Sequence, residues 1–203
     1  MIALVNYGLG NIQAFEHIYA RLNLPAYIAS TPSELRSATR IILPGVGSFD
    51  WAMRRLNESG LRECLDELVL RDKVPVLGVC VGFQMMAKSS DEGVLPGLCW
   101  FDAHVRRLDT SMFTQRTHLP HMGWNDVTVV PDAGLFADIE DPRFYFLHSY
   151  HFVPNHMAHA IATATYGMDF VAAASDGNIY GTQFHPEKSH AWGVGLLRNF
   201  ATM

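Results

Sequence analysis

Residues 75–84 read PVLGVCVGFQ, an apolar run that stops at a cysteine between two glycines. The run predicts a buried strand over 74–79, a sharp turn and a helix over 83–88. A strand, a turn that carries a nucleophile and a helix together form a nucleophile elbow. Gly78 and Gly82 lack side chains, so the chain is free to turn tightly and to hold the sulfur of Cys80 clear of its neighbours. The N–H groups at the start of the helix would favour the thiolate, the form that attacks carbonyl carbon.

A second motif lies at residues 181–189, which read GTQFHPEKS. The proline after His185 disfavours the helical region for the histidine, so we expect it to be extended. In an extended chain residues i and i+2 point to the same side, which brings Glu187 next to His185. The carboxylate would then hold the imidazole in one tautomer while the other ring nitrogen faces a thiol. The two motifs together predict a Cys80, His185 and Glu187 set for acyl transfer.

The tetrahedral intermediate of acyl transfer needs hydrogen-bond donors for its oxyanion. The backbone N–H of Val81, directly after the nucleophile, is one candidate donor. Residues 44–47 read PGVG and follow another strand-like run. Gly45 and Gly47 would allow the backbone N–H groups around Val46 to approach a ligand or to turn towards it. An ordinary strand-to-helix turn is the alternative interpretation of this loop.

The first half of the chain alternates strand-like and helical segments, which predicts a parallel sheet covered by helices on both faces. The second half contains strand-like runs with few helices between them, and these would extend or flank the sheet in mixed directions. In open parallel sheets the active site lies at the carboxyl ends of the strands, so the three motifs should meet at one edge. We expect strands at 2–6, 25–30, 40–43, 74–79, 98–108, 124–130, 145–148, 160–165, 170–174 and 179–184. We expect helices at 12–22, 49–58, 61–72, 83–88 and 192–201, and a short helix that follows a capping box at 31–34.

Composition limits the classes of function. A chain of 203 residues predicts a single domain spanning 1–203. The net charge of −5 and the lack of a basic run argue against a nucleic-acid partner. No stretch approaches the roughly 18 apolar residues of a membrane span, and the run at 1–5 is short for a signal peptide. Three cysteines without framework spacing indicate a reducing cytoplasm, with Cys64 in the core and no role for Cys99.

Two other patterns invite a ligand and are weak. The chain has histidines at 118, 121, 148, 151, 156 and 159 but no His-Glu-x-x-His or Cys-x-x-Cys spacing, so we expect hydrogen-bonded side chains near a cleft and no metal. The glycine-rich segment 8–11 lacks the third glycine of a dinucleotide fingerprint, so we expect no cofactor. The segment 121–125, HMGWN, is either a loop packed on the core by Trp124 or a surface that meets a partner.

Segments 78–84 and 185–187 together resemble the class I (triad) glutamine amidotransferases. Within that family, four further segments are similar to the glutaminase subunits of imidazole glycerol phosphate synthases. They are PGVG at 44–47, PHMGWN at 120–125, YFLHSY at 145–150 and FHPEKS at 184–189. The similarity runs from Asn6 to the last helix. It implies a flavodoxin-like α/β fold with a mixed, mainly parallel sheet.

The resemblance also implies a reaction. L-Glutamine would be hydrolysed to L-glutamate and ammonia through a thioester on Cys80, without a cofactor. Ammonia would pass to a separate (β/α)8-barrel cyclase that forms imidazole glycerol phosphate and AICAR in histidine biosynthesis. The glutaminase would be nearly silent until the cyclase binds its nucleotide substrate, with Val46 as the switch point by backbone rotation. The implied glutamine site contains Gly45, Val46, Gly47, Gln84, Ser149 and Tyr150, and the implied partner interface contains Asn11, Trp124, Tyr145 and Lys188.

Three alternatives remain open at this point. One is a paralogous ammonia donor for sugar amidation in surface-polysaccharide (O-antigen) biosynthesis, which would pair with a different synthetase. Another is a stand-alone cysteine hydrolase that turns over without a partner. The third is a binding or regulatory subunit that kept the fold and lost the activity. A chain of this length is used up by the glutaminase domain, so an ammonia acceptor would have to be a separate protein.

Overall fold

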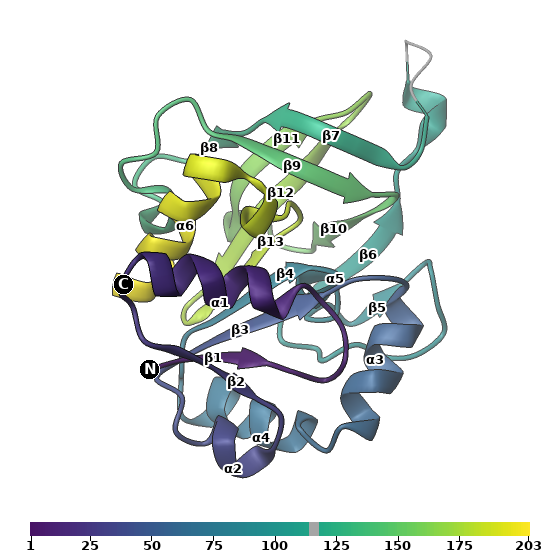
Figure 1. Ribbon diagram of the computed structural model, residues 1–203. Coiled ribbons are helices and arrows are strands. Elements are labelled where there is room, and N and C mark those ends of the chain that lie inside the picture. The colour runs from purple at the N-terminus through teal and green to yellow at the C-terminus, as the bar shows by residue number, and fades with distance from the viewer. Residues whose placement is uncertain (114–117) are drawn as a thin grey trace.

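A mixed sheet forms the centre of the protein (Figure 1). The computed structural model describes residues 1–113 and 118–203. The first strands of the sheet pair in parallel, and the last ones continue it antiparallel. The parallel strands, in spatial order, are β2 (Ala26–Ala29), β1 (Ile2–Val5), β3 (Arg40–Gly45), β4 (Val76–Cys80) and β13 (Ile179–Thr182). The antiparallel continuation is β12 (Asp169–Asp176), β11 (Ala160–Thr165) and β8 (Thr128–Val129).

Helices cover both faces of the parallel strands, as the alternation predicted. On one side α1 (Ile12–Arg21) packs on β1 and β2 and touches α6 (His190–Thr202). Figure 1 shows further helical segments on the other side. These are α2 (Pro32–Leu35), α3 (Phe49–Glu58), α4 (Arg62–Asp66) and the π-helix η1 (Glu67–Arg71). The short turns are α5 (Val81–Gln84) and the 3-10 helices η2 (Thr110–Met112), η3 (Gly134–Phe136), η4 (Met157–His159) and η5 (Pro186–Lys188).

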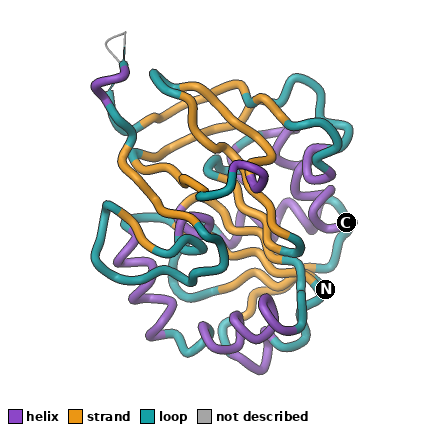
Figure 2. Tube along the Cα trace, turned by 180° about the vertical axis from the view of Figure 1, so that it is seen from behind, coloured by secondary structure: helices purple, strands orange, loops and turns teal. Residues whose placement is uncertain are grey.

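Two small sheets flank the antiparallel half, which is seen from behind in Figure 2. One consists of β10 (Tyr150–Pro154), β6 (Ala103–Arg107) and β5 (Ser89–Ser90), and the other of β7 (His121–Asp126) and β9 (Arg143–His148). Stacked aromatic rings join them to the core. The rings of Phe83 and Phe152 are 4.2 Å apart between centroids, and those of Phe144 and Phe184 are 3.9 Å apart. The small sheets therefore share the buried core with the main sheet.

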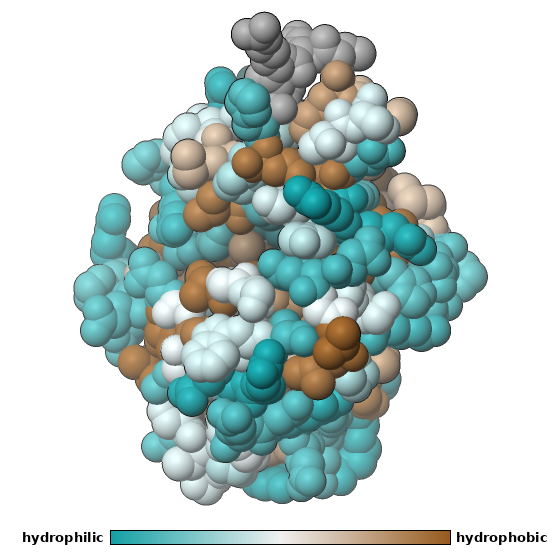
Figure 3. All heavy atoms as spheres, turned by 90° about the vertical axis from the view of Figure 1, so that its right-hand side faces the viewer, coloured by the Kyte–Doolittle hydropathy of each residue, from teal (hydrophilic) through white to brown (hydrophobic). Residues whose placement is uncertain are grey.

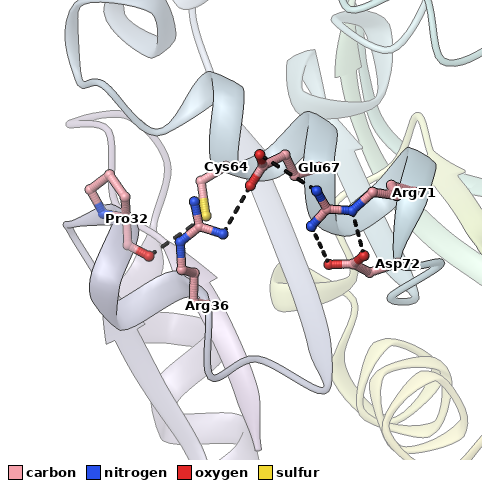
Figure 4. Close-up of polar contacts among 6 residues, drawn as sticks. All are labelled: Pro32, Arg36, Cys64, Glu67, Arg71 and Asp72. Atoms are coloured by element: carbon pink, nitrogen blue, oxygen red, sulfur yellow. Dashed lines mark hydrogen bonds and ion pairs between the residues drawn. The ribbon is translucent and has the colours of Figure 1, made fainter.

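Local signals explain the start of α2. The Thr31 hydroxyl accepts the Glu34 N–H at 3.3 Å, and the Glu34 carboxylate accepts the Thr31 N–H at 3.0 Å, so the predicted capping box is confirmed. The thiol of Cys64 donates to the carbonyl of Pro32 at 3.6 Å and is buried, as expected (Figure 4). Figure 4 also shows an exposed ion pair from Arg36 to Glu67 of η1 and another from Arg71 to Asp72, which contribute little because water screens them.

Some expected elements differ from the observed ones. The helix expected at 83–88 is the single turn α5, and the helix expected at 61–72 changes from α4 into the π-helix η1. Of the strand expected at 98–108, only β6 forms. The backbone N–H groups of Leu98 and Trp100 instead donate to the carbonyls of Met85 and Met86, so this apolar run packs back on the turn after α5. The segment 121–125 is strand β7 and not a loop.

No helix within residues 1–113 and 118–203 has the length and apolar character needed to cross a membrane. The carboxyl ends of the parallel strands point to the right-hand side of Figure 1. Figure 3 faces that side, where hydrophobic residues lie in separate patches among hydrophilic ones. The strands β3, β4 and β13 are neighbours, and the register places Gly45 beside Cys80 and Thr182 beside Val79. The three sequence motifs therefore meet at one edge of the sheet.

Candidate active site

Cys80 is the last residue of β4 and has a strained backbone, with φ 55° and ψ −113°. Such a conformation is rare for a residue with a side chain and persists only where the surroundings enforce it. Here strand β3 and the turn α5 approach each other closely. A Cβ at Gly82 would overlap the carbonyl of Leu43, and a Cβ at Gly78 would lie 2.6 Å from Cε of Met86. The backbone therefore has the geometry of the expected nucleophile elbow.

His185 follows β13 and is held by its side chain and its backbone. It is extended, with φ −101° and ψ 94°, and its Nδ1 donates to Oε1 of Glu187 at 2.8 Å. Both side chains are only 3% exposed. The backbone N–H of His185 donates to the carbonyl of Tyr145 at 2.9 Å, and its carbonyl accepts the Ser189 hydroxyl at 2.6 Å. Because Nδ1 is engaged, Nε2 is the ring nitrogen left to act on a thiol.

Cys80 and His185 line the same cavity of about 280 Å³. Burial alone would lower the pKa of the His185 imidazole. The charge of Cys80, a hydrogen bond with Cys80 and the Glu187 carboxylate outweigh burial and raise this pKa to about 10. The imidazole is thus a strong proton acceptor beside the sulfur. The same cavity is lined by other residues predicted for the glutamine site, which are Val46, Gly47, Val81, Ser149 and Tyr150. Lys188, which was predicted for the partner interface, also lines it.

Two predicted site residues, Gly45 and Gln84, lie behind the cavity wall. A Cβ at Gly45 would overlap the backbone nitrogen of Gly82, so this glycine allows the close approach of β3 and α5. Gln84 is buried, and its Nε2 donates to the carbonyl of Tyr150 at 2.9 Å and to Oε1 of Gln183 at 3.0 Å. Both residues support groups that line the cavity.

The cavity is also lined by residues that were not predicted for the glutamine site, and they are Glu92, Pro120, Leu147 and His148. Glu92 contributes a carboxylate from the loop after β5, and its Oε2 accepts the backbone N–H of Phe49 at 2.8 Å. The only sequence signal for Glu92 is an acidic residue in the loop that follows the nucleophile. That signal is weak without a known substrate.

Tyr7 is a further supporting residue that the sequence did not reveal. Its hydroxyl donates to the carbonyl of Pro44 at 2.6 Å and so fixes the peptide that precedes Gly45. Burial, and then the negative charge of Cys80, raise the pKa of the Tyr7 hydroxyl, which stays neutral and keeps its proton for this bond. In the sequence Tyr7 is part of a glycine-rich turn, and its contact with residue 44 is long-range.

Three of the four residues expected at a partner interface lie together. Trp124 of β7 is paired with Tyr145 of β9, and their ring centroids are 6.0 Å apart. The ammonium of Lys188 lies 6.0 Å from the centroid of the Tyr145 ring. Trp124 is 37% exposed and stacks on His190. Asn11 is exposed directly before α1 and makes no side-chain cap bond there.

In the described part of the chain, no three His, Cys, Asp or Glu side chains gather in a way that could hold a metal ion. His121 and His148 are buried and hydrogen-bonded to each other at 3.0 Å. These two histidines are therefore satisfied polar side chains, whereas Nδ1 of the buried His151 has no hydrogen-bond partner among the described residues.

The family model of class-I glutamine amidotransferases matches residues 4–202. The chain is 56% identical to the imidazole glycerol phosphate synthase subunit HisH of Bdellovibrio bacteriovorus, over 99% of each chain. It is 48% identical to the subunit of the same name from Leptospira interrogans, over 100% of each chain.

Solved structures are similar in fold. A glutamine amidotransferase crystal structure has a TM-score of 0.74 at 18% identity over 100% of each chain. PurLQS from Thermotoga maritima has a TM-score of 0.71 at 14% identity, covering 99% of this chain and 96% of that one. At these identities the likeness shows the fold alone, and it confirms the predicted α/β architecture.

Proposed function

The chain belongs to the class-I glutamine amidotransferase family and is an enzyme that acts on the amide of glutamine, and from this premise we propose that it is the glutaminase subunit of an imidazole glycerol phosphate synthase. Full-length identity of 56% and 48% to two HisH subunits supports the assignment within the family. The observation that carries the chemistry is a strained Cys80 and a buried His185 that open into one cavity, with Glu187 hydrogen-bonded to the histidine.

In the proposed reaction, Nε2 of His185 takes the thiol proton of Cys80 to form a thiolate–imidazolium pair, and the Sγ thiolate then attacks the side-chain amide carbon of glutamine. Glu187 stabilises the imidazolium through the 2.8 Å hydrogen bond to Nδ1. The carbon–nitrogen bond then breaks while the imidazolium returns the proton to the leaving nitrogen, which gives ammonia and a thioester on Cys80. Water, deprotonated by the same imidazole, attacks the thioester and releases glutamate.

The oxyanion of each tetrahedral intermediate needs donors that are already in place. We assign the backbone N–H of Val81 as one donor and a peptide N–H of the 45–47 loop as the other. Gly47 has a φ of 86°, a conformation that side-chain-bearing residues rarely adopt. Rotation of the peptide at Val46 would therefore change the number of donors, and it is the proposed switch between silent and active states. The Tyr7 hydroxyl fixes the peptide at Pro44 and would limit that rotation to the residues after it.

Glutamine also carries an α-ammonium and an α-carboxylate, which both need partners in the cavity. Glu92 supplies a carboxylate in the wall and is assigned to the ammonium. The backbone at Ser149 and Tyr150 is assigned to the carboxylate. In this proposal Gln84 acts indirectly, because its amide holds the carbonyl of Tyr150.

Ammonia released without an acceptor would be lost to water, so the proposal includes a separate (β/α)8-barrel cyclase subunit that forms imidazole glycerol phosphate and AICAR. We define the docking face as Met122, Trp124, Tyr145, Leu147 and Lys188. Met122 lies opposite Leu147 across β7 and β9, and both side chains are exposed. Exposed apolar and aromatic side chains of this kind are common anchors of protein interfaces. Asn11 is assigned to the rim of this interface, and a cytoplasmic location of the pair completes the proposal.

The test is glutamate release from L-glutamine by the purified chain, alone and with the histidine-pathway cyclase of the same organism plus its nucleotide ligand. We expect strong stimulation by the liganded cyclase in the wild-type chain and none in Cys80→Ala. Cys64→Ala is the matched control, because Cys64 is buried between α4 and α2 and outside the cavity. Stimulated release that survives in Cys80→Ala would contradict the assigned nucleophile.

Other outcomes favour the alternatives. Lack of stimulation, with Cys80 still alkylated by a glutamine-like electrophile, would indicate an ammonia donor for surface-sugar amidation with another synthetase. Rapid turnover of peptide or γ-glutamyl substrates without any partner would indicate a stand-alone cysteine hydrolase. Failure of the electrophile to label Cys80 would indicate a binding subunit.

A further inference from the structure

A buried chain of hydrogen bonds joins strand β7 to the wall of the cavity. The side-chain amide nitrogen of Asn125 lies 3.4 Å from Nε2 of His121. Nδ1 of His121 lies 3.0 Å from Nε2 of His148, and Nδ1 of His148 lies 2.9 Å from the carbonyl oxygen of Tyr150. His121 is 2% exposed and His148 is 6% exposed. The catalytic set of Cys80, His185 and Glu187 does not use either histidine.

The donor of each hydrogen bond in this chain can be assigned by starting from the Tyr150 carbonyl. The carbonyl of Tyr150 only accepts, so Nδ1 of His148 carries a proton and donates. Burial, and next the neighbouring His121, lower the pKa of His148 to about 3, while burial lowers the pKa of His121 to about 4. Both rings are therefore neutral at pH 7, so Nε2 of His148 accepts and Nδ1 of His121 donates. Nε2 of His121 is left to accept from Asn125, and each ring has a single tautomer.

The carbonyl of Tyr150 is the junction between this chain and the nucleophile. It accepts a second hydrogen bond from Nε2 of Gln84 at 2.9 Å. The same nitrogen donates to Oε1 of Gln183, whose Nε2 lies 4.0 Å from Sγ of Cys80. Tyr150 is thus held from the side of the nucleophile by Gln84 and from the side of β7 by His148.

The outer end of the chain lies behind the docking face. His121 and His148 are directly opposite each other in β7 and β9, and this pair is next to the exposed pair Met122 and Leu147. Met122 is 64% exposed. The His121 ring stacks on Phe146 and Tyr166, with centroid distances of 4.8 Å and 4.0 Å, so the ring is fixed relative to β9 and to the turn directly after β11. A shift of β7 under a bound partner would change the bond between the two imidazoles.

We propose that His121 and His148 are positioning residues that couple the docking face to the glutamine site. The proposal rests on the function assigned above. A partner that fixes β7 also fixes the His121–His148 bond, and through it the Tyr150 carbonyl and the 149–150 backbone assigned to the substrate carboxylate. The competing explanation is that the pair only satisfies polar groups in a buried sheet and stabilises the fold.

The test variant is His121→Phe, which keeps a ring between Phe146 and Tyr166 and removes both hydrogen bonds. His121→Asn is the matched control, because its amide nitrogen can take the place of Nδ1 and donate to His148. At saturating cyclase and nucleotide, we expect His121→Phe to lower the stimulation ratio of glutamate release about 10-fold, within the usual range of coupling between sites. Release by the isolated chain should stay within about twofold of wild type, and His121→Asn should recover part of the ratio.

A second pair of variants tests the same bonds if His121→Phe does not fold. His148→Asn retains a donor for Tyr150 and loses the bond to His121, so it should lower the stimulation ratio as His121→Phe does. His148→Gln retains an acceptor for His121 and loses the bond to Tyr150, so it should raise the KM for glutamine in the complex. The thermal midpoint of each variant is measured in parallel.

A stabilising role alone predicts a different result. Stimulated and unstimulated release would then fall together with the folded fraction, and an unchanged ratio in His121→Phe or His148→Asn would overturn the coupling. Absence of stimulation in the wild-type chain would overturn the assigned function and the coupling together. The wild-type measurement therefore separates failure of the assigned function from failure of the coupling alone.

Discussion

At the residue level, the His185 imidazole, proposed above as the catalytic base, is positioned by groups that have no part in the proposed reaction. The hydroxyl of Ser189 accepts the N–H of Tyr145 at 3.0 Å and donates to the carbonyl of His185 at 2.6 Å, and Ser189 is fully buried. The N–H of His185 returns a hydrogen bond to the carbonyl of Tyr145. The backbone of His185 is therefore fixed to β9 before substrate binds, and Glu187 only needs to orient the ring. Such support reduces the reorganisation required during reaction.

The charge of Glu187 can be removed with little change of shape by Glu187→Gln. We expect the pKa of His185, which lies near 10 in the wild-type chain, to fall, because a neutral amide no longer favours the imidazolium. Glutamine at this position also stabilises the wrong tautomer, so kcat of the stimulated enzyme should fall by up to about 10⁴-fold, as for the third member of a hydrolase triad. NMR titration of His185 and steady-state kinetics measure the two effects.

Glu34→Gln is the control for loss of one carboxylate, since Glu34 caps α2 and lies outside the cavity. It should leave the His185 titration unchanged. If Glu187→Gln keeps the wild-type His185 titration and kcat, the carboxylate does not serve the imidazole.

At the level of elements, α6 and η5 are in close contact through Gly193. A Cβ at Gly193 would overlap the carbonyl of Pro186, whereas a Cβ at Gly195 in the same helix would make only ordinary contacts with Ile139. Gly193→Ala should therefore push α6 away from η5, displace His185 and Glu187, and destabilise the fold by about 1–3 kcal/mol through overpacking. Urea unfolding and kcat report the two effects.

Gly195→Ala is the matched control in that helix. Alanine has a higher helix propensity than glycine, so this variant should stabilise the fold by about 0.5–1 kcal/mol and leave kcat unchanged. Equal effects of the two alanines would show that packing of α6 on η5 does not position the catalytic pair.

The sequence predicted elements where a local pattern determines them. Helix 49–58 and strand 160–165 have the expected bounds, and the capping box at Thr31 forms as read. The predicted contact between His185 and Glu187 was also local, because the two residues are two positions apart, and it forms. The helix expected at 83–88 was wrong because the backbone after α5 is engaged by residues 97–101. Tyr7 and Glu92 were missed for the same physical reason, since Tyr7 reaches Pro44 and Glu92 reaches the cavity through long-range packing that spacing does not encode.

At the level of the whole molecule, titration of buried histidines should set an optimum of stability. The pKa values of His121, His148 and His151 are lowered, chiefly by burial, to about 4, 3 and 4 from the ordinary 6.5. Below pH 6.5 the unfolded chain binds protons that the folded chain does not, so the free energy of unfolding falls towards pH 4. The raised pKa of His185 acts in the opposite direction. Its contribution is fully present below pH 6.5 and is lost as the pH rises through about 10.

From the titration of these four histidines alone, we expect the free energy of unfolding to peak near pH 6.5 when it is measured in urea across pH 4 to 10. His151→Phe should reduce the loss on the acid side, because His151 is buried and its Nδ1 has no hydrogen-bond partner among the described residues. A parallel decline of wild type and variant below pH 6.5 would show that His151 does not contribute to acid sensitivity.

The placement of the docking face relative to the cavity leads to a prediction about assembly. Trp124 stacks on His190 and pairs with Tyr145, so its ring is held in place while 37% of the residue stays exposed. An ordered aromatic side chain loses little conformational freedom on binding and is a typical hot spot, so Trp124→Ala should weaken cyclase binding by about 2 kcal/mol or more.

Leu70→Ala is the control, because Leu70 is 44% exposed in η1, which precedes the amino end of β4, and the cavity lies at the carboxyl end. Calorimetric titration with the cyclase should give a Kd raised about 30-fold or more for Trp124→Ala and unchanged for Leu70→Ala. Equal Kd values for the two variants would indicate that the partner does not bind at β7 and β9. Partner binding could then not act on Tyr150 through His121 and His148.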